Sequence, residues 1–111
     1  MAKVRFTRRA EADLDGISEY TRQNWGAVQE RTYLGELESC CIRLAASPLL
    51  GRACDEVRPG LRRMEQGRHA IFYRPEGNGI LVVRVLHQSM MPSRWSMAEG
   101  EWPSARISAS G

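Results

Sequence analysis

The sequence predicts an α+β fold in which a short N-terminal strand and an antiparallel helical hairpin pack on a mainly antiparallel sheet of three to four strands. Two observations lead to this class. Residues 8–46 carry apolar side chains at helical spacing, whereas residues 61–87 hold three short runs rich in β-branched and aromatic residues. The period changes at a loop of Pro, Gly and mixed charge over 48–60. At 111 residues, the chain is long enough for one domain with a modest core.

The first half of the chain is expected to form one strand and two helices. Residues 4–6 belong to a segment of alternating polarity, which is typical of a half-buried strand. Thr7 follows where an N-cap belongs, so a helix should run over about 8–23 and end near Gly26, which suits a positive-φ C-cap. A second helix over 27–46 should stop before a Ser-Pro pair. The short connection makes the two helices antiparallel neighbours.

The second half predicts three strands in meander order. They are expected at 61–65, 69–74 and 80–86, with a tight connection at Gln66-Gly67 and a five-residue reversal over Pro75–Gly79. The third run is apolar on both faces except at one arginine, and such a strand is usually covered on both sides. We therefore expect it to lie centrally in the sheet.

Arg84 is the polar exception in that third strand. Strand alternation places it on the same face as Ile80 and Leu86. Because an unpaired buried guanidinium costs several kcal/mol, it should have a carboxylate partner. We predict a structural ion pair with Glu56, with Glu65 as the other candidate nearby in the sequence. A cation that faces a ligand is the alternative interpretation.

Composition argues against a membrane-spanning, secreted or disulfide-stapled protein. No apolar run approaches the ~20 residues that span a bilayer, and the N-terminus lacks the apolar core of a signal peptide. Cys40, Cys41 and Cys54 lack metal-ligand spacing. We expect a cytoplasmic protein without metal or cofactor. The net charge is +3, and seven of the fifteen arginines lie between residues 52 and 84, which suits an acidic partner.

Residues 92–111 depart from the pattern of the preceding domain, which we place at 1–91. They show no periodicity and are rich in Ser, Gly, Pro and Ala, so we predict a mobile tail. Trp95 and Trp102 are notable there, because exposed tryptophans often dock on a partner. Their role stays open.

Several motifs recur in a fixed order along the chain. HAIFYR, a Gly/Asn turn and ILVVRVLHQSMM follow a helical hairpin, a connection Leu44-Ala45-x-x-Pro48-x-x-Gly51-Arg52, then Glu56 and Gly60-Leu61-Arg62. Together they cover about residues 3–91. This ordered set resembles the ParE branch of the RelE/ParE superfamily, the toxins of bacterial type II toxin–antitoxin operons.

The resemblance implies two partners. ParE toxins poison DNA gyrase by binding it and stabilising its cleaved-DNA state, which requires neither catalysis nor direct binding of nucleic acid by the toxin. Target contacts would come from surface arginines and the exposed end of the sheet: Arg62, Arg63, Arg68, Gln88, Ser89, Met90 and Met91. A cognate ParD-like antitoxin would fold its tail onto Tyr20, Trp25 and Tyr33. These aromatic residues can equally close the hairpin on the sheet, and the arginines can be a solvated face.

The alternative implied by the same superfamily is a RelE-like, ribosome-dependent mRNA endoribonuclease. Such nucleases draw a base, an acid and cations from the sheet face and the chain end. Glu56 and His87 match that pattern, but Ala70 stands where an arginine is expected and Gln88 where some relatives carry a tyrosine. Arg63 or Arg68 could substitute for the missing arginine, and with Arg68 the fallback catalytic set is Glu56, Arg68 and His87.

His87 also has a structural explanation, because strand alternation places it with Leu81, Val83 and Val85. A degenerate toxin that persists only as a binding or regulatory module is a third class.

Overall fold

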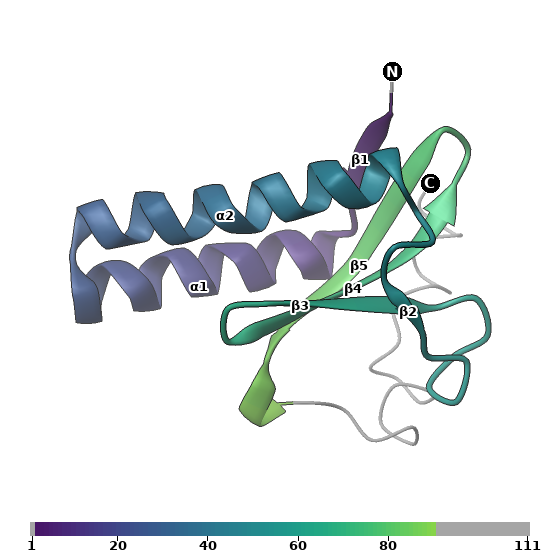
Figure 1. Cartoon of the computed structure of the whole chain (residues 1–111). Helices are drawn as coiled ribbons and strands as arrows, with labels where there is room; N and C mark the ends of the chain where they lie inside the picture. Colours follow the sequence, from purple (N-terminus) through teal and green to yellow (C-terminus); the bar gives the residue numbers. More distant parts are fainter. Residues whose placement is uncertain (1, 91–111) are drawn as a thin grey trace.

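Two antiparallel helices lie on one face of a five-stranded sheet in the computed structural model of the chain, which describes residues 2–90 (Figure 1). Helices α1 and α2 form the hairpin, and its free end extends past the sheet. The elements in chain order are β1 (Lys3–Phe6), α1 (Arg8–Trp25), α2 (Ala27–Ala46), β2 (Arg52–Ala53), β3 (Arg62–Gln66), β4 (His69–Glu76), β5 (Gly79–His87) and a 3-10 helix (Gln88–Met90). The predicted tail over 92–111, with Trp95 and Trp102, lies outside the described residues, as does Met91.

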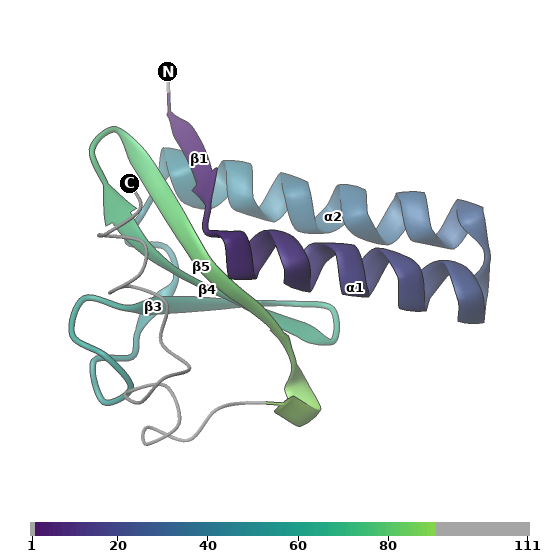
Figure 2. The same cartoon turned by 180° about the vertical axis from the view of Figure 1, so that it is seen from behind.

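The strand order is β1-β5-β4-β3-β2. Strands β2 to β5 pair antiparallel, whereas β1 pairs parallel with β5, from Lys3 opposite Gly79 to Phe6 opposite Val82 (Figure 2). Strand β5 is buried along its length between β1 and β4, so its predicted central place is confirmed. The predicted α+β class is confirmed as well. The fifth strand, β2, falls inside the predicted loop, because two residues are too few to create a pattern.

Local capping explains where the helices begin and end. The Thr7 hydroxyl accepts a hydrogen bond from the Ala10 amide at 2.9 Å and donates to the Val83 carbonyl at 2.9 Å. It therefore caps α1, as predicted, and also ties the helix to β5. Gly26, at φ +95°, separates the helices, and its amide donates to the Arg22 carbonyl. Helix α1 continues two residues past its predicted end. Neither helix in residues 2–90 is long and apolar enough to cross a bilayer.

The sheet carries a hydrophobic cluster on each face. The first packs under the helices and contains Ala10, Ile17, Leu37, Cys40, Cys41, Leu44, Ala45, Ile71, Tyr73, Ile80, Val82 and Val85. The second, on the opposite face, contains Cys54, Leu61, Ala70, Phe72, Leu81, Val83 and Leu86. Burial raises the pKa of the Cys41 thiol to about 12, so this cysteine acts as a small hydrophobe.

A β-bulge interrupts the pairing of β4 with β5. Tyr73 lies opposite Val82, but Phe72 lies opposite Arg84, which leaves Val83 as the extra residue. Beyond the bulge the alternation of β5 is shifted. Ile80 packs under the helices, while Leu86 joins the opposite face. The prediction that Arg84 shares one face with both is therefore wrong.

The carboxylate partner of Arg84 is Asp13 of α1, not Glu56. Arg84 Nε donates to Asp13 Oδ2 at 2.8 Å and Nη2 donates to Oδ1 at 3.1 Å. The same Oδ2 accepts from the Val85 amide at 2.9 Å, so Asp13 fastens α1 to the strand just after the bulge. Glu56 is exposed on the β2–β3 connection, whose Cys54 packs on the face away from the helices. The predicted Arg84–Glu56 pair is therefore wrong.

The second predicted candidate for that pair was Glu65. Its carboxylate pairs with Arg63 and lies 3.9 Å from Arg52 instead.

Candidate functional site

A pocket of about 590 Å³ lies between the hairpin, the β3–β4 turn and the end of β5. It brings together five residues that the sequence placed in separate functional sets: Tyr20, Trp25, Tyr33, Arg68 and His87. Its remaining lining residues are Ile17, Thr21, Gln29, Gly67 and His69. We call this the aromatic pocket. A second hollow of about 660 Å³, lined by Phe6, Leu14 and Leu34 among others, contains none of the predicted site residues.

Helical spacing builds the upper wall of the aromatic pocket. Ile17, Tyr20 and Trp25 recur along one side of α1, and Gln29 and Tyr33 are one turn apart on α2. Tyr20 is 64% exposed and Trp25 is 70% exposed, so neither closes the hairpin on the sheet. These are large apolar surfaces held at a fixed position on a helix.

Tyr33 has a different environment, because its hydroxyl joins α2 to the β3–β4 turn. The hydroxyl lies 2.6 Å from His69 Nδ1, accepts from the Arg68 amide at 3.0 Å, and lies 3.3 Å from the Gln66 carbonyl. A separation of 2.6 Å fits a hydrogen bond, so the hydroxyl joins α2 to β4 whichever of the two groups supplies the hydrogen. Burial raises the pKa of Tyr33, which keeps the hydroxyl protonated. Tyr33 thus closes the hairpin on the sheet, which is the role that the sequence offered as the alternative to an antitoxin contact.

Gly67 allows the Tyr33 ring to approach the turn. Its φ is +61°, and a Cβ at this position would lie 2.7 Å from Tyr33 ring atoms. Both the backbone conformation and the space therefore require glycine here.

His69 and His87 form the floor of the pocket. They lie directly opposite each other on β4 and β5, with ring centroids 5.2 Å apart in an edge-to-face arrangement at 85°. The Ser89 amide donates to His87 Nδ1 at 3.0 Å, and the Ser89 hydroxyl lies 2.8 Å from the same atom. Sequence analysis missed His69, because the turn register alone would set it opposite Leu86. The bulge at Val83 shifts the pairing by one residue.

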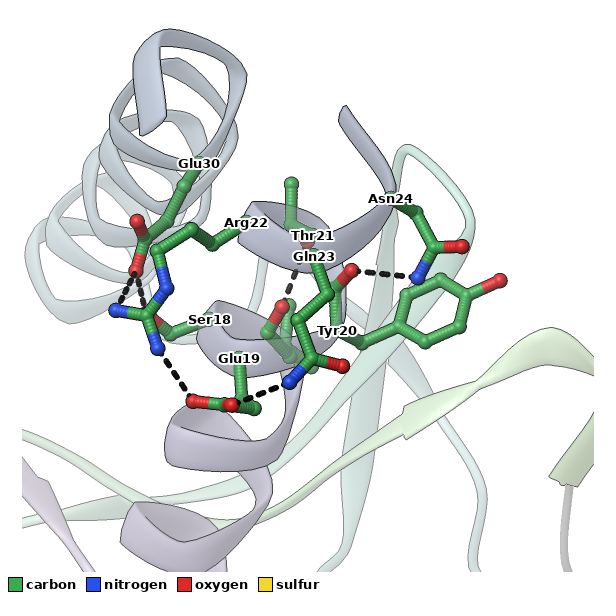
Figure 3. Close-up of polar contacts among 9 residues, drawn as sticks. Ser18, Glu19, Tyr20, Thr21, Arg22, Gln23, Asn24 and Glu30 are labelled. Atoms are coloured by element: carbon green, nitrogen blue, oxygen red, sulfur yellow. Dashed lines mark hydrogen bonds and ion pairs between the residues drawn. The ribbon is translucent and has the colours of Figure 1, made fainter. Parts of the chain in front are cut away.

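Two arginines near the pocket, Arg68 and Arg22, differ in whether a carboxylate pairs with them. No Asp or Glu lines it, and no carboxylate in residues 2–90 pairs with the Arg68 guanidinium. Arg22 lies near the same end of α1, but its guanidinium contacts Glu19 and lies 3.9 Å from Glu30 (Figure 3). Figure 3 shows Tyr20 on the opposite side of α1 from this ion-pair network. Arg68 therefore supplies the available cation of the pocket.

Other predicted target contacts lie away from the pocket. Arg62 Nε donates to the Gly51 carbonyl at 2.8 Å, and Arg63 stacks over the Phe72 ring, with 5.5 Å from Cζ to the centroid. Both arginines therefore have structural contacts within the fold. Gln88 and Ser89 are exposed in the 3-10 helix, which ends at Met90.

The fallback catalytic residues are only partly brought together. Arg68 and His87 line the aromatic pocket, but Glu56 is exposed on the β2–β3 connection. Ala70 is fully buried in the hydrophobic cluster on the opposite face, where it pairs with Glu65 of β3. Residues 2–90 contain no group of three or more His, Cys, Asp and Glu side chains that could hold a metal ion.

The environment of His69 predicts a pH dependence of folding stability. Burial, and secondarily the nearby His87, lower the pKa of His69 from the usual value of 6.5. Between this lowered pKa and about 6.5, the unfolded chain binds the proton more strongly, so the free energy of unfolding decreases as pH falls. Urea unfolding at about pH 7.5 and about pH 5.5 should show this decrease, and His69→Gln should reduce it. An equal pH dependence in both proteins would contradict the assignment.

Known proteins resemble this chain in sequence over most of its length. The family model described as "ParE toxin of type II toxin-antitoxin system, parDE" matches residues 4–92. The chain is 50% identical over 82 residues to Toxin ParE1 of Mycobacterium tuberculosis, and the aligned segment covers 73% of this chain and 84% of that protein. It is 42% identical over 90 residues to Toxin ParE1 of Caulobacter vibrioides, and the aligned segment covers 81% of this chain and 93% of that protein.

A solved structure extends the likeness to the fold. The structure titled "Chromosomal ParDE TA system from P. aeruginosa" superposes with a TM-score of 0.66 and covers 78% of this chain and 96% of that chain. The sequence identity is 22%, so this match supports the fold alone.

Proposed function

The chain belongs to the ParE toxin family of type II toxin–antitoxin systems, and from this membership we propose that it acts in the cytosol by binding and poisoning DNA gyrase. In this proposal a cognate ParD-like antitoxin neutralises it. The toxin makes and breaks no covalent bond, but stabilises the gyrase state in which DNA is cleaved.

The observation that carries the proposal is the burial of Ala70 at the position where a nuclease of this fold carries an arginine. A ribonuclease of this fold would need a cation at that position to stabilise the phosphorane. Ala70 is fully buried there among Phe72, Leu81 and Leu86. Loss of one electrostatic contact to a transition state typically costs about 10²–10³ in rate. A binding mechanism is unaffected by this difference.

The antitoxin contact is proposed at the aromatic pocket. Tyr20 and Trp25 leave most of their surface exposed beside a concave site, and aromatic side chains bury large areas with few rotatable bonds. Tyr33 supports the same pocket from below through its hydrogen bonds to the turn. A disordered antitoxin tail could gain enough buried area here to become ordered.

For the target contact we propose Arg68 together with Gln88 and Ser89, which are exposed after β5, and with the two residues that follow them in the sequence, Met90 and Met91. Arg62 and Arg63 are weaker candidates, because both have contacts within the fold. Arg68 belongs to both proposed surfaces, so a bound antitoxin would cover part of the target contact. This overlap provides a simple means of neutralisation.

Growth of a bacterial host tests the toxin–antitoxin pairing. Induction of the chain alone should arrest growth, and co-expression of the cognate antitoxin should restore it and yield a stable complex on purification. A chain that leaves growth unchanged and does not bind the antitoxin in a titration would contradict the proposal.

A further inference from the structure

The aromatic pocket presents hydrogen-bond donors, and no Asp or Glu of residues 2–90 lines it. His87 Nδ1 accepts from the Ser89 amide at 3.0 Å. With Nδ1 as an acceptor, a neutral His87 imidazole carries its hydrogen on Nε2. Arg68 adds a guanidinium that has no carboxylate partner in the described part of the chain. A guanidinium and a neighbouring imidazole N–H form a donor set that suits a carboxylate.

The wall beside these donors is apolar. On α1, Ile17 is buried, whereas Tyr20 and Trp25 are exposed and continue the apolar wall of the pocket towards the solvent. A ligand that fills the pocket therefore needs an acidic group next to an apolar one. From this charge complementarity we infer that the aromatic pocket takes up an acidic side chain of the antitoxin tail on Arg68, with an adjacent apolar side chain packed against Tyr20 and Trp25. This inference rests on the proposed function and specifies the chemistry of that contact.

A nucleic acid strand fits the pocket less well than an acidic peptide. Strand binding combines aromatic stacking with a row of cations that follows the phosphates. Only one arginine lines the pocket, and Arg22 nearby is already engaged by Glu19 and Glu30. One cation matches one carboxylate.

A double-mutant cycle between toxin and antitoxin tests the inference. The probe is the full-length cognate antitoxin, with each Asp and Glu of its C-terminal tail replaced in turn by Asn or Gln. Arg68→Gln in the toxin should weaken binding by about tenfold or more, because the remaining carboxylate would be buried without its partner. Arg43→Gln is the matched control, since Arg43 is also exposed but lies at the other end of α2 outside the pocket. It should change affinity by less than about twofold.

The cycle has a specific signature. For one tail acid, its neutralisation should cost about tenfold with wild-type toxin and almost nothing with Arg68→Gln. Equal effects of Arg68→Gln and Arg43→Gln, or no coupling to any acid, would overturn the inference while leaving the toxin–antitoxin pairing intact. Loss of binding to a single-stranded oligonucleotide in Arg68→Gln, with antitoxin affinity unchanged, would overturn it in favour of nucleic acid. If wild-type toxin does not bind the antitoxin, the proposed function itself fails.

Discussion

Replacement of Asp13 by alanine is expected to lower the free energy of unfolding by about 3–5 kcal/mol. The side chains of Arg84 and Asp13 are only 10% and 14% exposed, and they share two hydrogen bonds of 2.8 and 3.1 Å. Removal of the carboxylate leaves a buried guanidinium without this partner and deprives the Val85 amide of its acceptor. The segment of β5 just after the bulge would lose its link to Asp13 at the same time, while the Thr7 hydroxyl would still bind the Val83 carbonyl.

Urea unfolding measures this effect, with Asp15→Ala as the matched control. Asp15 is an exposed carboxylate on the same helix, and its removal should change stability by less than about 0.5 kcal/mol. The double variant Asp13→Leu, Arg84→Met removes both charges and should recover much of the loss, because no buried charge remains. The same stability for Asp13→Ala and Asp15→Ala would contradict the structural role. A double variant no more stable than Asp13→Ala would contradict the ion-pair explanation.

Replacement of Trp25 by alanine is expected to weaken antitoxin binding by about 2–4 kcal/mol, which is roughly 30- to 1,000-fold. Trp25 is 70% exposed in the free toxin, so its truncation should cost little folding stability. In the proposed complex, the indole would become buried beside Tyr20 and over the floor of the aromatic pocket. Isothermal titration with purified antitoxin gives the affinity directly.

Val28→Ala is the control for this substitution. Val28 is 72% exposed near the same end of the hairpin but does not line the pocket. Its truncation should leave the affinity nearly unchanged. If both substitutions weaken binding to the same extent, the contact is spread over the hairpin tip and the pocket has no special role.

Local sequence signals predicted the helices and the long strands well. Helical periodicity, the Thr7 cap and the glycine at 26 depend on interactions within a few residues, so they can be recognised without the fold. The apolar run of β5 likewise predicted its central place. Strand β2 is two residues long and exists only because β3 pairs with it. A strand of two residues is too short to leave an alternating pattern in the sequence.

The candidate site was predicted in pieces but not as an assembly. Tyr20, Trp25 and Arg68 were each predicted as contacts and His87 as a fallback catalytic residue, yet their meeting in one pocket depends on tertiary packing. His69 faces His87 because the bulge changes the strand register by one residue. The same bulge changes the faces of β5, and the carboxylate beside it comes from α1, far away in sequence. Simple alternation therefore assigned Arg84 to the wrong face, and nearness in the sequence suggested the wrong partner.

The most direct test of the account compares gyrase and the ribosome as targets of the purified, antitoxin-free toxin. With gyrase and plasmid DNA, supercoiling should be inhibited and linear DNA should accumulate, while ribosome-bound mRNA should stay intact. Glu56→Ala should keep the wild-type potency on gyrase at matched folded concentration, since Glu56 is exposed outside the aromatic pocket. Codon-phased cleavage of mRNA on ribosomes, abolished by Glu56→Ala or His87→Ala, would contradict the account and establish the ribonuclease function instead.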